Sequence, residues 1–294
     1  MANRRLHNGA MNASLLALVA IALWGGLATL GVRLSSLPPF WLTGVALCLG
    51  SVIALPLSGF DLRRWRVPLR TLALGVYGLF GFHFLLFIAL RHAPAVQANL
   101  VNYLWPLGMV VMAPLCLRGV RWHSAHGMAA LLGFAGAALA ITGRNPVAVL
   151  DGGLAWGYVP ALGSALVWAT YSLWTQRVPA FDTSAIGLFA LVSGLLSLLC
   201  HVALEPPVDV QAIWQGPLLW PLLLMGLGPL GAAFFLWDAA LKRGDAQQIG
   251  LLSFITPVLS TVLLLWSQGQ ALHWSLALAT AMIVGAALWG RRVR

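Results

Sequence analysis

The residues best suited to bind a small molecule lie inside long apolar runs of the sequence. They combine aromatic rings with imidazole and amide groups, and they are Trp24, His83, Asn102, Tyr103, Trp105, Trp168 and Gln248. Tryptophan normally gathers at membrane interfaces, where one end of the ring meets water. Three of the fourteen tryptophans instead fall near the middle of their runs, at positions 24, 105 and 168. A buried indole N–H needs a hydrogen-bond partner, and a bound substrate could provide one.

Each of these candidates also has a purely structural interpretation. The three tryptophans could pack against small residues, and His83 could be a neutral histidine held by one internal hydrogen bond. Gln248 fits a capping box in which Asp245 is the N-cap of a helix. Asp238 precedes Lys242 by four residues near a helix end, so an ion pair explains its presence. The sequence leaves these alternatives open.

Patterns typical of catalysis or metal binding do not occur. There is no pair of carboxylates at a useful spacing, no Gly-x-Ser-x-Gly and no phosphate-binding glycine loop. The three cysteines, Cys48, Cys116 and Cys200, lie in or at the ends of apolar runs and are expected to pack as small apolar residues. We therefore expect a protein that is not an enzyme and has no metal site and no cofactor.

The composition indicates where such residues must sit. The chain is 60% hydrophobic and 8% charged, with a mean hydropathy of +0.88, whereas a soluble domain carries roughly a quarter charged residues. The apolar runs are continuous and about twenty residues long, which as a helix spans the ~30 Å hydrocarbon core of a bilayer. They do not alternate as the strands of a membrane β-barrel do. The sequence predicts an all-α integral membrane protein.

The pattern of apolar runs, loops and prolines predicts ten transmembrane helices. Their approximate bounds are 12–33, 40–58, 69–90, 94–117, 125–143, 155–177, 183–203, 216–241, 246–268 and 271–290. Met1 to Arg5 is basic, yet the first run is too long for a signal peptide and lacks a clear cleavage site, so we expect it to be retained.

The chain is a doubled unit. Residues 89–106 recur without a gap 151 positions later as residues 240–257, with six of the eighteen positions identical. Trp24 and Arg33 match Trp168 and Arg177 at an offset of 144. These matches predict two five-helix repeats, 1–150 and 151–294, around a central cavity.

Five helices is an odd number, so the second repeat must enter the membrane upside down. Fused, inverted repeats are typical of transporters that alternate access around a central site. Pro106 and Pro257 occupy equivalent positions in the recurring segment and each frees a backbone carbonyl, so we expect them to act as hinges.

Lysine and arginine predict the orientation. With the N-terminus inside, fourteen of the seventeen lie on the cytoplasmic side, and only Arg33, Arg91 and Arg144 lie outside. Both termini are therefore expected in the cytoplasm, with the chain in the inner (plasma) membrane. The net charge of +10 then reflects topology and contact with lipid headgroups. No soluble domain carries a basic face, so a nucleic-acid partner is not expected.

The segment Ala89–Pro106, its copy ending at Phe254–Pro257, Leu23–Gly26 and Leu166–Tyr171 resemble the EamA-type branch of the drug/metabolite transporter superfamily. The Asn-Tyr-Leu-Trp-Pro form of the segment, with His83 and Trp168, is similar to the aromatic amino-acid exporters of that branch. The resemblance implies export of amino acids, aromatic ones included, by alternating access. The aromatic rings would meet the substrate side chain, and His83, Asn102 and Gln248 would meet the zwitterion.

The absence of a charged residue at the membrane midplane suits a net-neutral substrate. The first span also lacks the carboxylate that small multidrug antiporters use, so proton antiport through that position is not expected. Another solute, such as a drug or a nucleoside-like metabolite, is the alternative substrate, and a membrane-embedded enzyme is a third possibility that lacks a catalytic pair. The expected partners are the small-molecule substrate and membrane lipids, with a monomer or weak dimer as the assembly.

Overall fold

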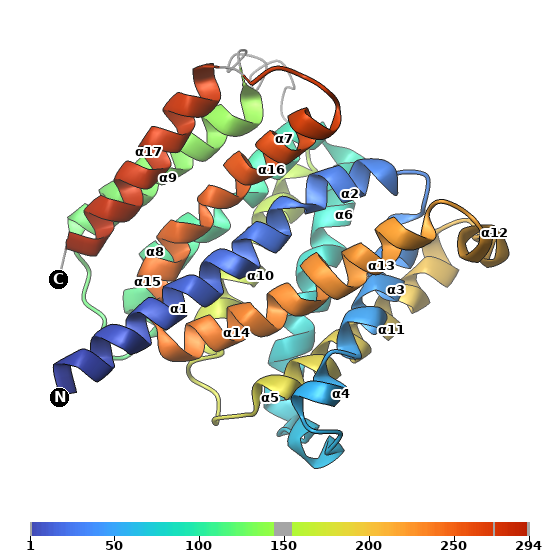
Figure 1. Ribbon diagram of the computed structural model, residues 1–294, viewed down its shortest axis with the longest axis horizontal. Helices are drawn as coiled ribbons and strands as arrows, with labels where there is room; N and C mark the ends of the chain where they lie inside the picture. Colours follow the sequence, from blue (N-terminus) through green and yellow to red (C-terminus); the bar gives the residue numbers. More distant parts are fainter. Residues whose placement is uncertain (1, 144–154, 273, 293–294) are drawn as a thin grey trace.

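The computed structural model describes residues 2–143, 155–272 and 274–292, and within these ranges the side chains of residues 12–290. Every regular element in these ranges is helical, as the composition predicts (Figure 1). In chain order the helices are α1 (Ala2–Gly25), α2 (Leu27–Arg33), α3 (Pro39–Ser51), α4 (Ala54–Leu57), α5 (Leu69–Val76), α6 (Phe82–His92), α7 (Ala95–Asn102), α8 (Trp105–Cys116), α9 (Ser124–Thr142), α10 (Tyr158–Trp174), α11 (Ile186–Leu204), α12 (Val210–Gln215), α13 (Leu219–Leu227), α14 (Ala233–Arg243), α15 (Ala246–Ser253), α16 (Ile255–Ser267) and α17 (Trp274–Arg292).

Eight stretches of the described chain are long and apolar enough to cross a membrane. They are Asn12–Arg33, Pro39–Leu57, Leu69–His92, Ala95–Cys116, Ser124–Thr142, Thr183–Leu204, Leu219–Arg243 and Ala246–Ser267. Each begins and ends within a few residues of a predicted span, and the shorter helices α10 and α17 occupy the other two predicted positions. The predicted boundary between the repeats, at 150/151, and Arg144 lie outside the described residues.

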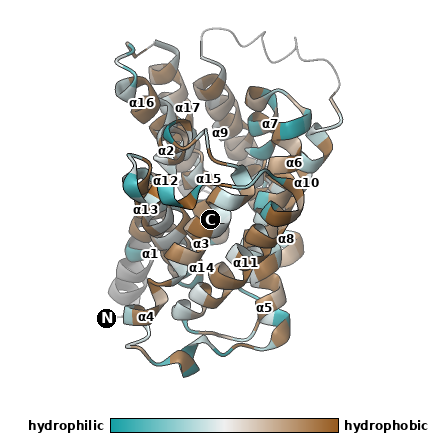
Figure 2. Cartoon of the chain, turned by 90° about the vertical axis from the view of Figure 1, so that its right-hand side faces the viewer, coloured by the Kyte–Doolittle hydropathy of each residue, from teal (hydrophilic) through white to brown (hydrophobic). Residues whose placement is uncertain are grey.

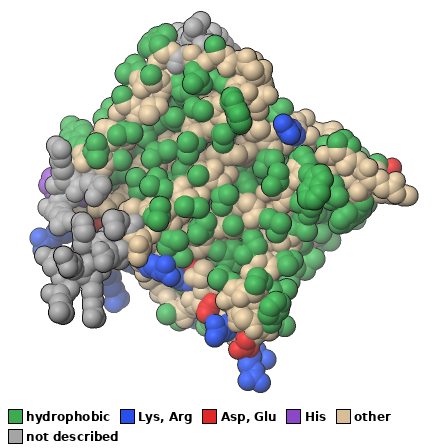
Figure 3. Space-filling model, viewed as in Figure 1, with side chains coloured by type: hydrophobic (Ala, Val, Ile, Leu, Met, Phe, Trp, Pro, Cys, Tyr) green, Lys and Arg blue, Asp and Glu red, His purple; other side chains and the backbone are tan. Residues whose placement is uncertain are grey.

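The outer surface of the bundle is apolar. Large hydrophobic side chains such as Leu115, Val202 and Trp266 are 78–80% exposed, and hydrophobic atoms dominate the face drawn in Figure 3. Figure 2 shows the same pattern on the ribbon, with hydrophobic segments along the helices and hydrophilic ones concentrated toward their ends. Because a water-soluble monomer rarely exposes apolar area on this scale, this surface faces lipid. The chain is a multi-pass membrane protein.

Several spans are interrupted, and the interruptions recur at the offset of the sequence repeat. A π-helical turn separates α5 from α6 at Tyr77–Gly81, and another separates α13 from α14 at Gly228–Ala232, 151 positions later. The break between α7 and α8 at Tyr103 likewise matches the break between α15 and α16 at Phe254. Such π-turns locally rotate a helix and occur often at functional sites. The side chains that follow each interruption therefore point in a different direction from the one they would have in a continuous α-helix.

Glycine allows helices to touch along their backbones. A Cβ atom on Gly50 of α3 would lie 2.6 Å from the carbonyl oxygen of Leu230 and 2.8 Å from that of Gly226. Close approach through small residues is the usual way in which membrane helices associate, because lipid supplies no hydrophobic force between them. Helix α3 is thus fixed against α13 and the π-turn that begins at Gly228.

Candidate functional site

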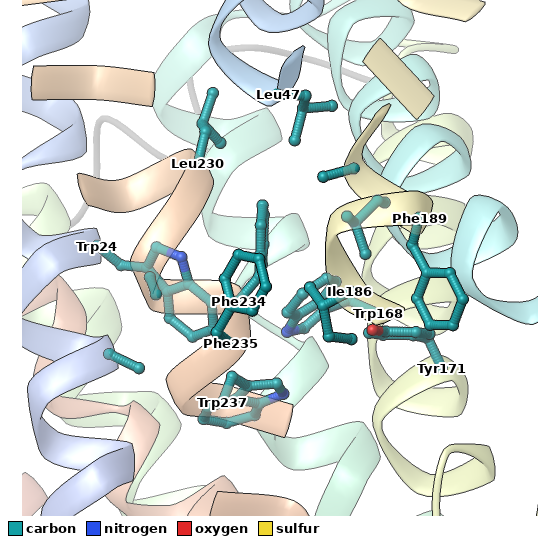
Figure 4. Packing of buried hydrophobic residues seen from close by; sticks show 14 of the residues in the cluster. Trp24, Leu47, Trp168, Tyr171, Ile186, Phe189, Leu230, Phe234, Phe235 and Trp237 are labelled. Atoms are coloured by element: carbon teal, nitrogen blue, oxygen red, sulfur yellow. The ribbon is translucent and has the colours of Figure 1, made fainter. Parts of the chain in front are cut away.

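Five aromatic side chains meet at the centre of the bundle. Trp24 of α1, Trp105 of α8, Trp168 of α10, and Phe234 and Trp237 of α14 form what we call the central aromatic cluster. Figure 4 labels all of these residues except Trp105. The ring centroids of the cluster's contacting pairs lie 5.1–6.5 Å apart, mostly edge to face. This is the range in which aromatic pairs attract one another. The structure therefore brings the three mid-span tryptophans of the sequence into one place.

The four indole N–H groups of the cluster differ in their partners. Trp24 Nε1 donates to the carbonyl of Pro229 at 3.0 Å, and Trp237 Nε1 donates to the hydroxyl of Ser172 at 3.1 Å. Trp105 and Trp168 are 5% and 3% exposed, yet within the described chain their Nε1 atoms have no hydrogen-bond acceptor. A buried indole usually has a partner. These two donors are therefore the groups of the cluster available to a ligand.

His83 borders the cluster and has one nitrogen to spare. It follows the π-turn of the third span, it is 7% exposed, and its ring centroid lies 6.4 Å from that of Phe234. Nδ1 lies 2.6 Å from the carbonyl oxygen of Leu79. Because a carbonyl can only accept, Nδ1 carries the proton and Nε2 of the neutral ring is an acceptor. The expected internal hydrogen bond therefore exists, and it leaves Nε2 free of any partner among the described residues.

The other predicted polar residues lie apart from the cluster. Asn102 is buried at the end of α7, where its Oδ1 accepts a hydrogen bond of 2.7 Å from the hydroxyl of Ser164. Tyr103 is half-buried at the break that follows, and Gln248 is half-buried in the first turn of α15. No ring contact or hydrogen bond joins Asn102, Tyr103 or Gln248 to the cluster in the part of the chain that the structure describes.

Asp245 is the N-cap of α15, as the sequence predicts. Its carboxylate accepts the backbone N–H groups of Gln247 and Gln248 at 2.7 and 3.1 Å. The buried amide beside this cap belongs to Gln247, whose Nε2 donates to the carbonyl of Val110 at 3.3 Å. Pro106 and Pro257 fall in the first turns of α8 and α16, directly after the breaks. Both prolines are thus positioned at a helix restart rather than inside a continuous helix.

The rings fill the space in which the sequence predicts a central cavity. The five members of the cluster are at most 8% exposed and pack on further buried side chains such as Tyr171, Ile186 and Phe189 (Figure 4). A cavity of about 360 Å³ lies elsewhere, between α2 and α16, lined by Gly26, Thr29, Leu30, Arg33, Leu263, Trp266 and Ser267. In this conformation the five rings of the central aromatic cluster therefore pack directly against one another.

Sequence reasoning missed Phe234 and Trp237, which supply two of the five rings. The offset of 151 between the recurring segments pairs Phe234 with His83, so extending the repeat six residues upstream would have identified it. Trp237 has no such signal, because Leu86 stands at the matching position. Its neighbours Asp238 and Lys242 form the expected ion pair, with 2.6 Å between Oδ2 and Nζ.

A bundle of apolar helices around a buried centre with free hydrogen-bonding groups defines a multi-pass membrane protein of the kind that binds small molecules between its helices. The chain belongs to the EamA-like transporter family, which matches residues 11–142 and 155–289. The family assignment agrees with the resemblance found in the sequence.

Individual relatives extend this assignment. The aromatic amino acid exporter YddG of Ancylobacter novellus is 36% identical over 286 residues, covering 94% of this chain and 96% of its own. The exporter of the same name from Salmonella typhimurium is 27% identical and covers 85% and 87% of the two chains. The uncharacterized inner membrane transporter YhbE of Escherichia coli is 26% identical, covering 77% and 69%. A solved crystal structure with 36% sequence identity superposes with a TM-score of 0.83 and covers 96% of this chain and 98% of its own.

Proposed function

We propose that this transporter exports amino acids, including aromatic ones, from the cytoplasm by alternating access. The central aromatic cluster carries the proposal, because the buried side chains of Trp105 and Trp168 carry N–H donors that have no acceptor among the described residues. A carboxylate is a strong acceptor for such donors, and the surrounding rings can enclose an aromatic side chain. No member of the cluster is charged, which suits a zwitterion with no net charge. The exporters named YddG among the relatives support the same substrate class.

The arrangement proposed for the chain is two inverted five-helix repeats, residues 1–150 and 151–294. The paired π-turns and paired helix breaks at an offset of 151 support the repeat, and so do the two segments that match the family. The excess of lysine and arginine at one end supports inverted insertion with both termini in the cytoplasm. In this arrangement Pro106 and Pro257 would lie at equivalent depths and serve as the hinges.

Transport by the purified protein in liposomes tests the substrate class. Liposomes loaded with unlabelled phenylalanine should accumulate radiolabelled phenylalanine or tryptophan by counterflow, whereas liposomes without protein should not. Alanine, threonine, lysine and uridine supplied as competitors would define the range, and we expect lysine and uridine not to compete. Accumulation of labelled uridine without accumulation of any amino acid would refute the proposal and favour a nucleoside-like substrate.

A further inference from the structure

Two basic residues related by the sequence repeat reach opposite ends of helix α11. Arg91 and Lys242 stand 151 positions apart, each in the last turn of its helix, α6 and α14. Arg91 contacts Glu205, the first residue after α11, and Lys242 contacts Thr183, three residues before α11 begins. Helix α11 is therefore held at its two ends by Arg91 and Lys242, which occupy equivalent positions in the two repeats.

The fastening after α11, which we call the outer clasp, is built on a buried carboxylate. Glu205 has a side chain only 1% exposed, and its Oε1 accepts a hydrogen bond from Arg91 Nη2 at 3.0 Å. His201 Nδ1 lies 3.1 Å from Oε2. The backbone N–H groups of Phe40 and Trp41, in the first turn of α3, donate to the same carboxylate at 3.0–3.2 Å. Glu205 therefore joins α11 to α3 through several bonds, and to α6 through Arg91.

The fastening before α11, which we call the inner clasp, joins that end to α14. Lys242 Nζ donates to Asp238 Oδ2 at 2.6 Å and to the backbone carbonyl of Phe181 at 2.9 Å. Its ammonium group also lies 3.6 Å from the centroid of the Phe181 ring. The hydroxyl of Thr183 donates to Asp238 Oδ2 at 2.7 Å. Helix α14 supplies the acid and the base of this clasp, and the segment leading into α11 supplies the other partners.

Helices α3 and α11 behave as one rigid body. A Cβ on Gly44 of α3 would lie 3.0 Å from the carbonyl oxygen of Gly194, and a Cβ on Gly194 of α11 would lie 2.7 Å from Cys48 Sγ. Backbones this close cannot slide without a clash. Because Glu205 also binds the first turn of α3, the carboxylate stays with the pair. For α6 to separate from the pair, the Arg91 bond must break together with the contacts that Phe84, Phe87 and Arg91 make with the Phe40 ring.

Each clasp can open without leaving its buried carboxylate bare of hydrogen-bond partners. If Arg91 withdraws, Glu205 keeps its bonds to His201 and to the start of α3. If the segment before α11 withdraws, Asp238 keeps Lys242, which lies on its own helix. An isolated buried carboxylate would make opening prohibitively costly. Both basic side chains are partly exposed, at 37% for Arg91 and 27% for Lys242, so water can solvate them once they are released.

We infer that the outer and inner clasps are the two gates of transport, at which the end of α6 and the end of α14 separate in turn from the α3–α11 pair. Release of Arg91 opens the site to the outer side while the inner clasp holds. Release of the inner clasp opens it to the cytoplasm while Arg91 holds. The inference rests on the proposed transport by alternating access, but not on the identity of the substrate.

Accessibility of a reporter cysteine tests the outer gate without any substrate. Phe87 lies between the outer clasp and the candidate site, with its ring centroid 5.4 Å from Phe40 and 6.1 Å from His83. In a variant with the three native cysteines replaced by serine, Phe87→Cys would be labelled in intact cells by a membrane-impermeant maleimide. We expect Arg91→Gln to raise the labelling rate about fivefold, equivalent to ~1 kcal/mol at 1.36 kcal/mol per tenfold.

Matched variants separate gating from a general loss of structure. Arg33→Gln removes an exposed arginine at the same end that has no ion pair within the described chain, and it should leave labelling unchanged. Arg91→Lys should restore the parental rate, because a single N–O contact does not need the guanidinium fork. Lys242→Gln should lower outer labelling, whereas Arg243→Gln should not. A monodisperse peak on size-exclusion chromatography is required of each variant.

Cross-linking then tests whether opening is needed for transport. Cysteines at Arg91 and Glu205, joined by a short bifunctional methanethiosulfonate reagent, should abolish counterflow of any transported solute, and reduction should restore it. Equal labelling in Arg91→Gln and Arg33→Gln, or undiminished transport with the clasp cross-linked, would overturn the gating inference. If the protein transports no amino acid, the proposed substrate class is wrong, but the labelling experiment still tests the gates because it needs no substrate. The proposed function and the gating inference can therefore fail separately.

Discussion

Replacing one indole of the central aromatic cluster by phenylalanine should separate ligand binding from packing. Trp105 and Trp237 are both buried and their ring centroids lie 5.7 Å apart, but among the described residues only the indole N–H of Trp237 has an acceptor, the hydroxyl of Ser172. A hydrogen bond to a charged group contributes about 1.5–3 kcal/mol. If Trp105 donates to the substrate carboxylate, Trp105→Phe should weaken substrate affinity by about tenfold to 150-fold.

Trp237→Phe is the matched control, because it removes the same atoms from the same cluster. It breaks an internal hydrogen bond to Ser172, so it should lower the free energy of unfolding by about 0.5–1.5 kcal/mol, seen as a lower melting temperature. Its affinity for phenylalanine should stay near the parental value. Equilibrium binding of radiolabelled phenylalanine to the purified variants measures both affinities. Equal losses of affinity, or an unchanged affinity in a stable Trp105→Phe protein, would show that Trp105 only packs the core.

Three further outcomes can be checked. Gly50→Ala should lower the melting temperature sharply, at a cost of about 1–3 kcal/mol or more, because the new methyl would meet two backbone carbonyls, whereas Gly31→Ala has open space and should be neutral or slightly stabilising. Pro106→Ala and Pro257→Ala should each slow counterflow more than they weaken equilibrium binding of the transported solute, and loss of binding with unchanged maximal turnover would contradict the hinge. A cysteine at Val208 should react with impermeant maleimide in intact cells if the termini are cytoplasmic, and protection there would reverse the orientation.

The helices could be predicted from the sequence because a bilayer demands an apolar run of fixed length. Each predicted span coincides with helical segments, even where Gly26 or Tyr103 interrupts the helix, because an interruption does not change the length of the apolar run. The π-turns were not predictable in this way. A turn such as Tyr77–Gly81 or Gly228–Ala232 leaves hydropathy untouched and alters only the rotation of the residues that follow.

The candidate site was predictable only in part. Trp24, Trp105 and Trp168 could be singled out because a mid-span tryptophan contradicts the normal preference for the interface. Trp237 could not, because the rotation after the π-turn decides which face of α14 meets the centre. Glu205 stands in a stretch that looks like an ordinary external loop, yet it is buried through partners up to 165 positions away. A local sequence pattern cannot predict a hydrogen bond between residues so far apart in the chain.

The two repeats contribute equivalent helix breaks to the site, but the side chains at equivalent positions differ in chemistry. His83 and Phe234 occupy equivalent positions, each follows a π-turn, and their rings meet edge to face with 6.4 Å between the centroids. The first can accept a hydrogen bond through Nε2, whereas the second offers only an apolar ring. A solute bound beside this pair would meet a polar group from one repeat and an apolar ring from the other. An amino acid with an aromatic side chain presents that same pair of faces, with the ammonium group suited to His83 and the ring to Phe234, so this divergence between the copies fixes the direction in which the substrate would lie.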